Sequence, residues 1–314
     1  MLKPKPRGEL SQSLFEALGT DSADWSMLLA TPVTDDDDLH IALWTMYELS
    51  YHGFEDVDDS LEWDAGRLGV RRRLEAEFER TLRDRYTPVT FEGAFDQALF
   101  ALIQDDDGPS LATFVRQHAN REQALELLRH RSVYHLKESD PVVWVVPRLS
   151  VRVKAALMEL QYDEYGCGDP NRLHSGLFAR GIADSGLSPT YGAYVDDAPF
   201  EVLAQNNAMS MFGVHRRLRG AALGHLAAFE ATSSLPSRKM AQGLTRLGFP
   251  ESMVGYYNEH VEADAVHEQL AIRTICGTLV EDEPALTDDI QFGAFTCLDL
   301  EARFATRMQD EWAA

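Results

Sequence analysis

The sequence predicts an all-α protein. Apolar residues recur every three or four positions along most of the 314-residue chain, as in the segment VRVKAALMELQYDEY. No segment shows the sustained alternation of polar and apolar residues that marks a half-buried strand. The sequence also contains no internal repeat and no low-complexity linker. Helices of this kind bury their apolar faces against one another in a bundle.

The N-terminal part predicts helices over residues 10–18, 39–52 and 63–85. The run Thr34-Asp35-Asp36-Asp37-Asp38 is a strong helix start, because it supplies capping side chains and negative charge at the positive end of the helix dipole. Pro88 and Gly93 then mark a break. We therefore expect an N-terminal helical extension over residues 1–90 and a larger helical domain over residues 91–314.

Within the larger part, the apolar spacing predicts a series of helices separated by turns that contain glycine, proline and aspartate. Asp140-Pro141 is expected to end one of them, and Asp169-Pro170 is expected to begin another after the break at Gly166-Cys167-Gly168. The predicted ranges are 94–104, 110–117, 121–138, 148–165, 169 onward, 200–233, 237–247, 251 onward and 287–307.

The segment YYNEHVEADAVHEQL, residues 256–270, carries the clearest functional pattern. At about 100° per residue, His260, Asp264 and His267 lie within roughly 60° of arc on one helix face. Two imidazoles and a carboxylate are poor core material unless each finds a partner. They are good ligands for a first-row transition metal such as iron. Glu262 points to another face of the same helix.

Other metal ligands have to come from other helices. Glu164 and His174 flank the Gly-x-Gly-Asp-Pro break, and each has a structural alternative, a helix end and a core histidine. Glu230 lies in an Ala-rich helix that can pack tightly, where a carboxylate is unexpected unless it has a functional role. His225, on another face of this helix, is expected to be a structural hydrogen bonder. Glu138 lies near a helix end and could equally be a surface residue.

Glu48 and His52 form a further pair at the i,i+4 spacing that could bind metal. A structural role is favoured for them, because Gly53 ends the helix directly after His52. The ferritin-like arrangement is excluded, since it requires two Glu-x-x-His pairs and the chain has none.

The composition of the chain limits the classes of binding partner and the cellular location that we expect. The formal net charge is −22, from 29 basic and 51 acidic residues, which disfavours nucleic acid and anionic membranes. Three cysteines without a CxxC pair argue against a disulfide framework and a zinc ribbon. The N-terminus has no apolar stretch of the signal-peptide type, so we expect a cytoplasmic protein. A small-molecule substrate is expected, with an electron donor or reductase and a homodimer as further possibilities.

Four segments together make the chain recognisable, LKESDP, VPRLSVRVKAALMELQYDEYGCGDPNRLHSGLF, HRRLRGAALGHLAAFEATSS and YYNEHVEADAVHEQL. They resemble the iron-containing redox enzymes of the heme-oxygenase-like diiron oxidase and oxygenase family, and in particular its N-oxygenating, N-nitrosourea-forming type. The resemblance covers roughly residues 90–310, and its most specific piece is His260-x-x-x-Asp264-x-x-His267. Residues 1–90 carry no matching ligand motif.

The resemblance implies a heme-oxygenase-like helical bundle that holds two iron ions and uses O2 as co-substrate. It implies that Glu164, His174, Glu230 and Asp264 are catalytic residues. The implied ligand set is Glu138, Glu164, His174, Glu230, His260, Asp264 and His267. The implied reaction is N-oxygenation of an amine or amino-acid-derived metabolite, and desaturation, decarboxylation or C–C cleavage are alternatives that use similar ligands.

Two functions of other classes are also compatible with the sequence. A heme-binding protein on the same scaffold would need one proximal histidine and an apolar slot, and would not need so many inward carboxylates. A non-catalytic helical protein would bind no iron. Substrate contacts could come from Arg148, Arg216, Arg217 and Arg219 or from Tyr165, Tyr191, Tyr257 and Phe229, although ion pairing and core packing are the simpler roles.

Overall fold

The computed structural model describes residues 1–20, 24–90 and 93–313 and, within them, all side chains except those of residues 262–265. All regular elements of the described residues are helices and none is a strand, so the predicted all-α class is confirmed. Among the described residues, no helix is both long and apolar enough to cross a membrane.

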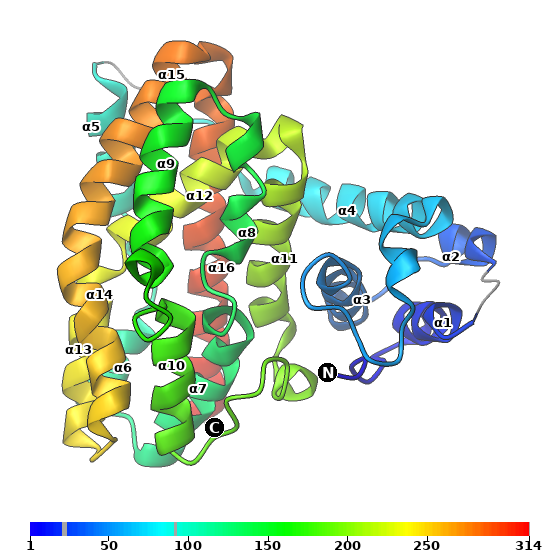
Figure 1. Ribbon diagram of the computed structural model, residues 1–314, viewed down its shortest axis with the longest axis horizontal. Coiled ribbons are helices and arrows are strands. Elements are labelled where there is room, and N and C mark those ends of the chain that lie inside the picture. Colours follow the sequence, from blue (N-terminus) through cyan, green and yellow to red (C-terminus); the bar gives the residue numbers. More distant parts are fainter. Residues whose placement is uncertain (21–23, 91–92, 314) are drawn as a thin grey trace.

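The α-helices fall into an N-terminal group and a larger bundle (Figure 1). The N-terminal group consists of α1 Glu9–Leu18, α2 Trp25–Ala30, α3 Asp36–Glu48 and α4 Ala65–Arg85. The bundle begins with α5 Phe95–Gln104, α6 Leu111–Gln117, α7 Arg121–His135, α8 Asp140–Val143, α9 Val151–Glu164 and α10 His174–Asp184. It continues with α11 Phe200–Val214, α12 Arg219–Ala231, α13 Ser234–Arg246, α14 Glu251–Gln269, α15 Gly277–Asp282 and α16 Thr287–Ala313.

Figure 1 shows the N-terminal helices lying to one side of the bundle, with α3 facing α11. As predicted, α3 begins after Asp35, whose side chain accepts hydrogen bonds from the backbone N–H groups of Asp37 and Asp38. Since α3 and α11 pack against each other, the N-terminal helices and the bundle are in direct contact. That residues 1–90 and 91–314 form separate domains stays a prediction.

The helices α12 and α16 pack side by side in the bundle, and this close approach explains the small residues of α12. A Cβ atom on Gly224 would come within 1.9 Å of the carbonyl oxygen of Ile290, and one on Gly293 within 1.9 Å of that of Ala221. Only glycine therefore fits at these two positions. The contact fixes α12, which carries Glu230.

One predicted helix, over residues 200–233, is wrong as a single element. The chain leaves the helix at His215, which is extended with φ −99° and ψ 114°, and a 3-10 turn, Arg216–Leu218, precedes α12. The guanidinium group of Arg148 donates hydrogen bonds to the carbonyl oxygens of Gly213 and Val214, which satisfies the end of α11. This contact comes from a distant part of the chain and has no local signal.

Two predicted helix boundaries are also wrong. The side chain of Asp169 accepts a hydrogen bond from the backbone N–H of Asn171, so it caps a turn, and α10 begins only at His174. Asp140-Pro141 begins the short helix α8, whereas the preceding helix α7 already ends at His135. As a result, Glu138 lies in the turn after α7, and His174 lies directly after the turn that precedes α10.

The helix that carries the histidine motif continues past its predicted part. After α14 the chain winds as a π-helix over Leu270–Cys276 before it resumes as α15. Such wider turns inside α-helices are frequent near functional sites. Here the change begins three residues after His267.

Candidate metal centre

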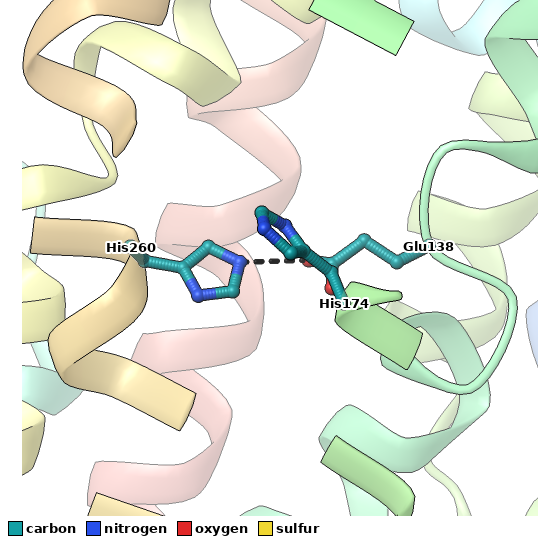
Figure 2. A group of neighbouring side chains, drawn as sticks. All are labelled: Glu138, His174 and His260. Carbon is teal, nitrogen blue, oxygen red and sulfur yellow. Dashed lines mark ion pairs between the residues drawn. The ribbon is translucent and has the colours of Figure 1, made fainter. Parts of the chain in front are cut away.

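Three candidate ligands, Glu138, His174 and His260, form the first group of neighbouring side chains. Each offers one ligand atom, and these atoms all lie within 4.8 Å of one another. Figure 2 shows Glu138 and His260 pointing toward each other, joined by an ion pair in which Nε2 of His260 lies 3.6 Å from Oε1 of Glu138. The rings of His174 and His260 are 4.6 Å apart at their centroids. All three side chains are buried.

Glu164, Glu230 and His267 form the second group, and again one ligand atom of each lies within 4.8 Å of the others. The Nδ1 atom of His267 is 3.4 Å from Oε1 of Glu164 and 3.5 Å from Oε2 of Glu230. These side chains are buried as well, with at most 6% of their surface exposed.

Glu164 connects the two groups. Its Oε2 atom lies 3.1 Å from Nδ1 of His174 in the first group, while its Oε1 atom faces His267 in the second. Six of the seven predicted ligands therefore meet in one buried place, from α9, α10, α12, α14 and the turn after α7. The seventh, Asp264, lies on α14, and its side chain is outside the described residues.

The break between α9 and α10 brings Glu164 and His174 together. Gly166, Cys167 and Gly168 all have positive φ, at 68°, 56° and 84°. A Cβ atom at Gly166 would lie 2.6 Å from the backbone nitrogen of Leu173, so only glycine allows the chain to fold back this tightly. As a result, the last residue of α9 faces the first residue of α10.

Glu138 is positioned by another unusual turn. The next residue, Ser139, has a φ of 72°, a left-handed conformation that is uncommon for a residue with a side chain. Its hydroxyl group donates a hydrogen bond of 2.9 Å to Oε2 of Glu164. Strained backbone of this kind tends to persist where the surrounding structure holds functional groups in place.

Neighbouring side chains orient the candidate ligands, and sequence reasoning missed three of them. Nδ1 of His260 lies 2.8 Å from the carbonyl oxygen of Tyr256, so this nitrogen carries the proton and Nε2 faces the group. The hydroxyl of Tyr256 donates to Oε2 of Glu138 at 2.9 Å, and Nδ1 of His135 lies 3.0 Å from Oε1 of the same carboxylate. Nε2 of His267 faces Oδ2 of Asp163 at 2.9 Å.

A local signal could have found the missed residues. His135 precedes Glu138 by three positions, Tyr256 precedes His260 by four, and Asp163 stands next to Glu164. Residues at these helical spacings share a face or a neighbouring face. Carboxylates, tyrosines and carbonyl groups that hold metal-binding histidines are a general feature of metal sites.

The pKa values show that the cluster of buried charge must be compensated. Burial would raise the pKa of Glu138, but the charges of His135 and His260 hold it well below its usual range. Burial and the neighbouring Glu164 raise the pKa of Glu230. Burial would lower the pKa of His267, but its hydrogen bond to Glu230 and the nearby carboxylates raise it to about 9. Burial would lower the pKa of His174, but Glu164 raises it, so protons on His174 and His267 help to balance the carboxylates when no metal is bound.

The donor set fits two ions of a first-row transition metal. Three imidazoles and three carboxylates converge in two adjoining groups, and both ligand types suit iron. Magnesium or calcium would favour oxygen ligands alone. Two divalent cations would also neutralise the buried carboxylates that protons otherwise balance.

Other candidates have structural roles. Glu48 forms a buried ion pair with Lys137 and accepts a hydrogen bond from Tyr191, while His52 packs on the ring of Tyr191, so the predicted structural role of this pair agrees with the contacts. Arg217 and Arg219 pair with Glu79 and Glu283, respectively.

His225 is predicted from the sequence to be a structural hydrogen bonder. It is buried and its ring contacts that of Phe212, with 6.3 Å between the centroids, so its role as a structural hydrogen bonder stays a prediction.

One cavity adjoins the candidate ligands, and a second lies next to the first. A chamber of about 30 Å³ touches Glu138, Glu164, Glu230 and His260, and it has room for a molecule about the size of water or O2. A pocket of about 500 Å³ lies beside it. The two cavities share five lining residues, Tyr134, Met209, His225, Phe229 and Ser233.

Comparison with models of known protein families identifies a match. The model of a family described as iron-containing redox enzyme matches residues 125–302, which include all six described candidate ligands. No curated protein matches the chain.

Proposed function

The chain belongs to the family of iron-containing redox enzymes, with the heme-oxygenase-like helical fold predicted from the sequence, and from this premise we propose that it is a nonheme diiron enzyme that uses O2 to oxidise a small metabolite. The observation that carries the proposal is the pair of adjoining buried groups, each of which has carboxylate and imidazole ligand atoms within 4.8 Å of one another. A heme protein would have no use for three carboxylates in its pocket.

In this proposal, Glu138, His174 and His260 would hold one ion and Glu164, Glu230 and His267 would hold the other. Glu164 faces both groups and could contribute a ligand atom to either. Asp264 completes the set, since its spacing places it on the helix face of His260 and His267. When bound, the iron would supply the one-electron chemistry that allows O2 to react with an organic molecule.

We propose N-oxygenation of an amine as the reaction. One oxygen atom of O2 forms the new N–O bond of a hydroxylamine, and the N–H hydrogen it replaces remains on that oxygen. The other oxygen atom leaves as water, which requires two electrons and two protons from an external reductant such as a reduced flavin or an iron–sulfur protein. Desaturation, decarboxylation and C–C cleavage are the alternatives that product analysis would distinguish.

Metal analysis tests the proposal directly. The purified protein is equilibrated anaerobically with Fe(II), separated from free iron and analysed for metal and protein. We expect two ions per chain in the wild type and fewer in Glu164→Ala and Asp264→Ala. Glu262→Ala, on another face of the same helix, serves as the control and should keep both. A wild-type protein with one ion or none, or one that binds hemin instead, would contradict the diiron proposal.

A second measurement addresses the reaction. Oxygen consumption by the iron-loaded protein is followed with a reductant and a panel of amines, amino acids and fatty acids, and products are identified by mass. We expect hydroxylamine products from at least one amine. Turnover confined to fatty acids would favour the decarboxylation or desaturation alternatives.

A further inference from the structure

The pocket of about 500 Å³ is much larger than O2 needs, and it lies beside the small chamber at the candidate ligands. A pocket of this size matches those that bind small organic molecules. The residues that line both cavities come from α7, α11 and α12 and from Ser233 at the start of α13. We call this part of the wall the metal side of the pocket.

Lys239 lines the pocket away from the metal side, where α6 and α13 pack against each other. It follows Ser233 by six positions on a continuous helical path, in which the backbone N–H of Ser237 donates to the carbonyl oxygen of Ser233 at 2.8 Å. Such a stretch of α-helix spans about 9 Å. The ammonium group of Lys239 donates a hydrogen bond of 2.9 Å to Oγ1 of Thr113 on α6, which holds the positive charge at this end.

The ammonium group of Lys239 has no counter-ion among the described residues. No described carboxylate lies within ion-pair distance of it, and its hydrogen bond to Thr113 uses only one of its donors. Lys239 is half-buried, so its charge has lost part of its hydration. The chain has a net charge of −22 and repels anions at long range. An anion in this pocket therefore depends on a cation that it touches, and Lys239 supplies one with free donors.

The other charged side chains of the pocket are already engaged. Arg131, which is half-buried, forms a bidentate ion pair with Glu301, so these two charges cancel. Asp106 is exposed to solvent, and its carboxylate accepts a hydrogen bond from the backbone N–H of Gly108. The charge that remains for a ligand inside the pocket is therefore positive, and it lies at Lys239.

We propose that this pocket is the organic substrate site and that it takes a carboxylic acid, whose carboxylate pairs with Lys239 while its other end reaches the metal side. Apolar side chains such as Leu127 and Met240 line the pocket and suit a carbon chain. The inference rests on the proposed function for the reaction, and the group to be oxidised would stand at the end opposite the carboxylate. Decarboxylation would need the carboxylate at the metal centre, so it does not fit this arrangement.

Calorimetric titration of the iron-loaded protein under anaerobic conditions tests the inference. Octanoate and octanamide are the probes, since they share a chain length and the shape of the polar end and differ in charge. We expect octanoate to bind and octanamide to bind at least tenfold more weakly. Lys239→Met should weaken octanoate binding by at least tenfold, whereas Lys239→Arg should retain most of it. Arg238→Met removes the same charge from an exposed neighbour that does not line the pocket, and it should bind octanoate as the wild type does.

Iron content, measured on the same samples, separates this inference from the proposed function. Lys239 is not a candidate ligand, so its variants should hold as much iron as the wild type. A wild type that binds octanoate through Lys239 but holds no iron would refute the diiron proposal and leave the carboxylate site standing. Full iron with no octanoate binding, with binding unchanged in Lys239→Met, with an equal loss in Arg238→Met, or with octanamide bound as tightly would overturn the carboxylate site.

Discussion

Single side chains decide how the buried charge of the metal centre is balanced, and His267 has the largest role. Its ring lies between Glu164, Glu230 and Asp163, and these carboxylates raise its pKa to about 9. A histidine in an unfolded chain has a pKa near 6.5. The folded, metal-free protein therefore keeps a proton that the unfolded chain has already lost at neutral pH.

The first prediction follows from this difference. The stabilisation by protonated His267 is complete below about pH 6.5 and is lost as the pH rises through about 9, because the folded-state pKa is the higher one. We expect metal-free protein to lose up to about 3 kcal/mol of unfolding free energy across this range, at 1.36 kcal/mol per pKa unit. Urea unfolding at several pH values measures it. His267→Gln should remove the effect, and a flat wild-type profile would contradict the assignment.

Asp163 supports the second prediction. Its carboxylate holds Nε2 of His267 at 2.9 Å, which leaves Nδ1 to face Glu164 and Glu230. Removing a residue that orients a metal-bound histidine typically weakens metal affinity by about 10- to 100-fold. We expect this loss in Asp163→Ala, measured by competition with a chelator. Glu159→Ala removes an exposed carboxylate from the same helix and should have no effect.

At the scale of elements, the sequence predicts where helices form better than where they end. The apolar spacing and the caps at Asp35 and Ser110 are local features, and the structure agrees with both starts. The break at His215 depends on Arg148, which lies more than sixty residues away, and Asp169 caps a turn in place of a helix. The ligand pattern on α14 could be recognised because its spacing lies within one helix.

The convergence of the site could be predicted only in part. Glu164 and His174 flank glycines whose positive φ reverses the chain, so their proximity had a local cause. The approach of Glu138 depends on the left-handed Ser139, and serine carries no signal for this conformation. The role of Asp264 stays a prediction from its spacing alone.

The contact between α12 and α16 carries the third prediction. In Gly293→Ala the new methyl group would meet the carbonyl oxygen of Ala221 at 1.9 Å, so the helices have to separate. Overpacking of this kind costs about 1–3 kcal/mol. We expect a lower thermal midpoint and weaker iron binding, since Glu230 lies on α12. Gly255→Ala on α14, where a Cβ atom meets nothing within 4 Å, should keep both properties.

At the scale of the whole molecule, the N-terminal helices are joined to the metal centre through one buried ion pair. Glu48 of α3 pairs with Lys137, the residue before Glu138, and both are almost fully buried. The ammonium group of Lys137 lies 4.4 Å from the centroid of the Tyr51 ring, and Tyr191 donates a hydrogen bond of 2.7 Å to Glu48. Residues 1–90 contribute none of the seven proposed metal ligands, but through this ion pair they support the turn that contains Glu138.

The fourth prediction tests this support. Glu48→Ala leaves the charge of Lys137 buried without its partner, and such a change costs about 3–5 kcal/mol. We expect a matching loss of unfolding free energy and, because Glu138 is the next residue, weaker iron binding. Replacing both members, in Glu48→Leu with Lys137→Met, removes the unpaired charge and should restore most of the stability.

The double variant separates two roles of the ion pair. If the pair only balances charge, the apolar replacement should restore stability and iron binding together. If it also fixes the path of the turn at Ser139, stability should return while iron binding stays weak, because the apolar side chains pack without a defined direction. A double variant as unstable as Glu48→Ala would show that burial of Lys137 is not what links the N-terminal helices to the bundle.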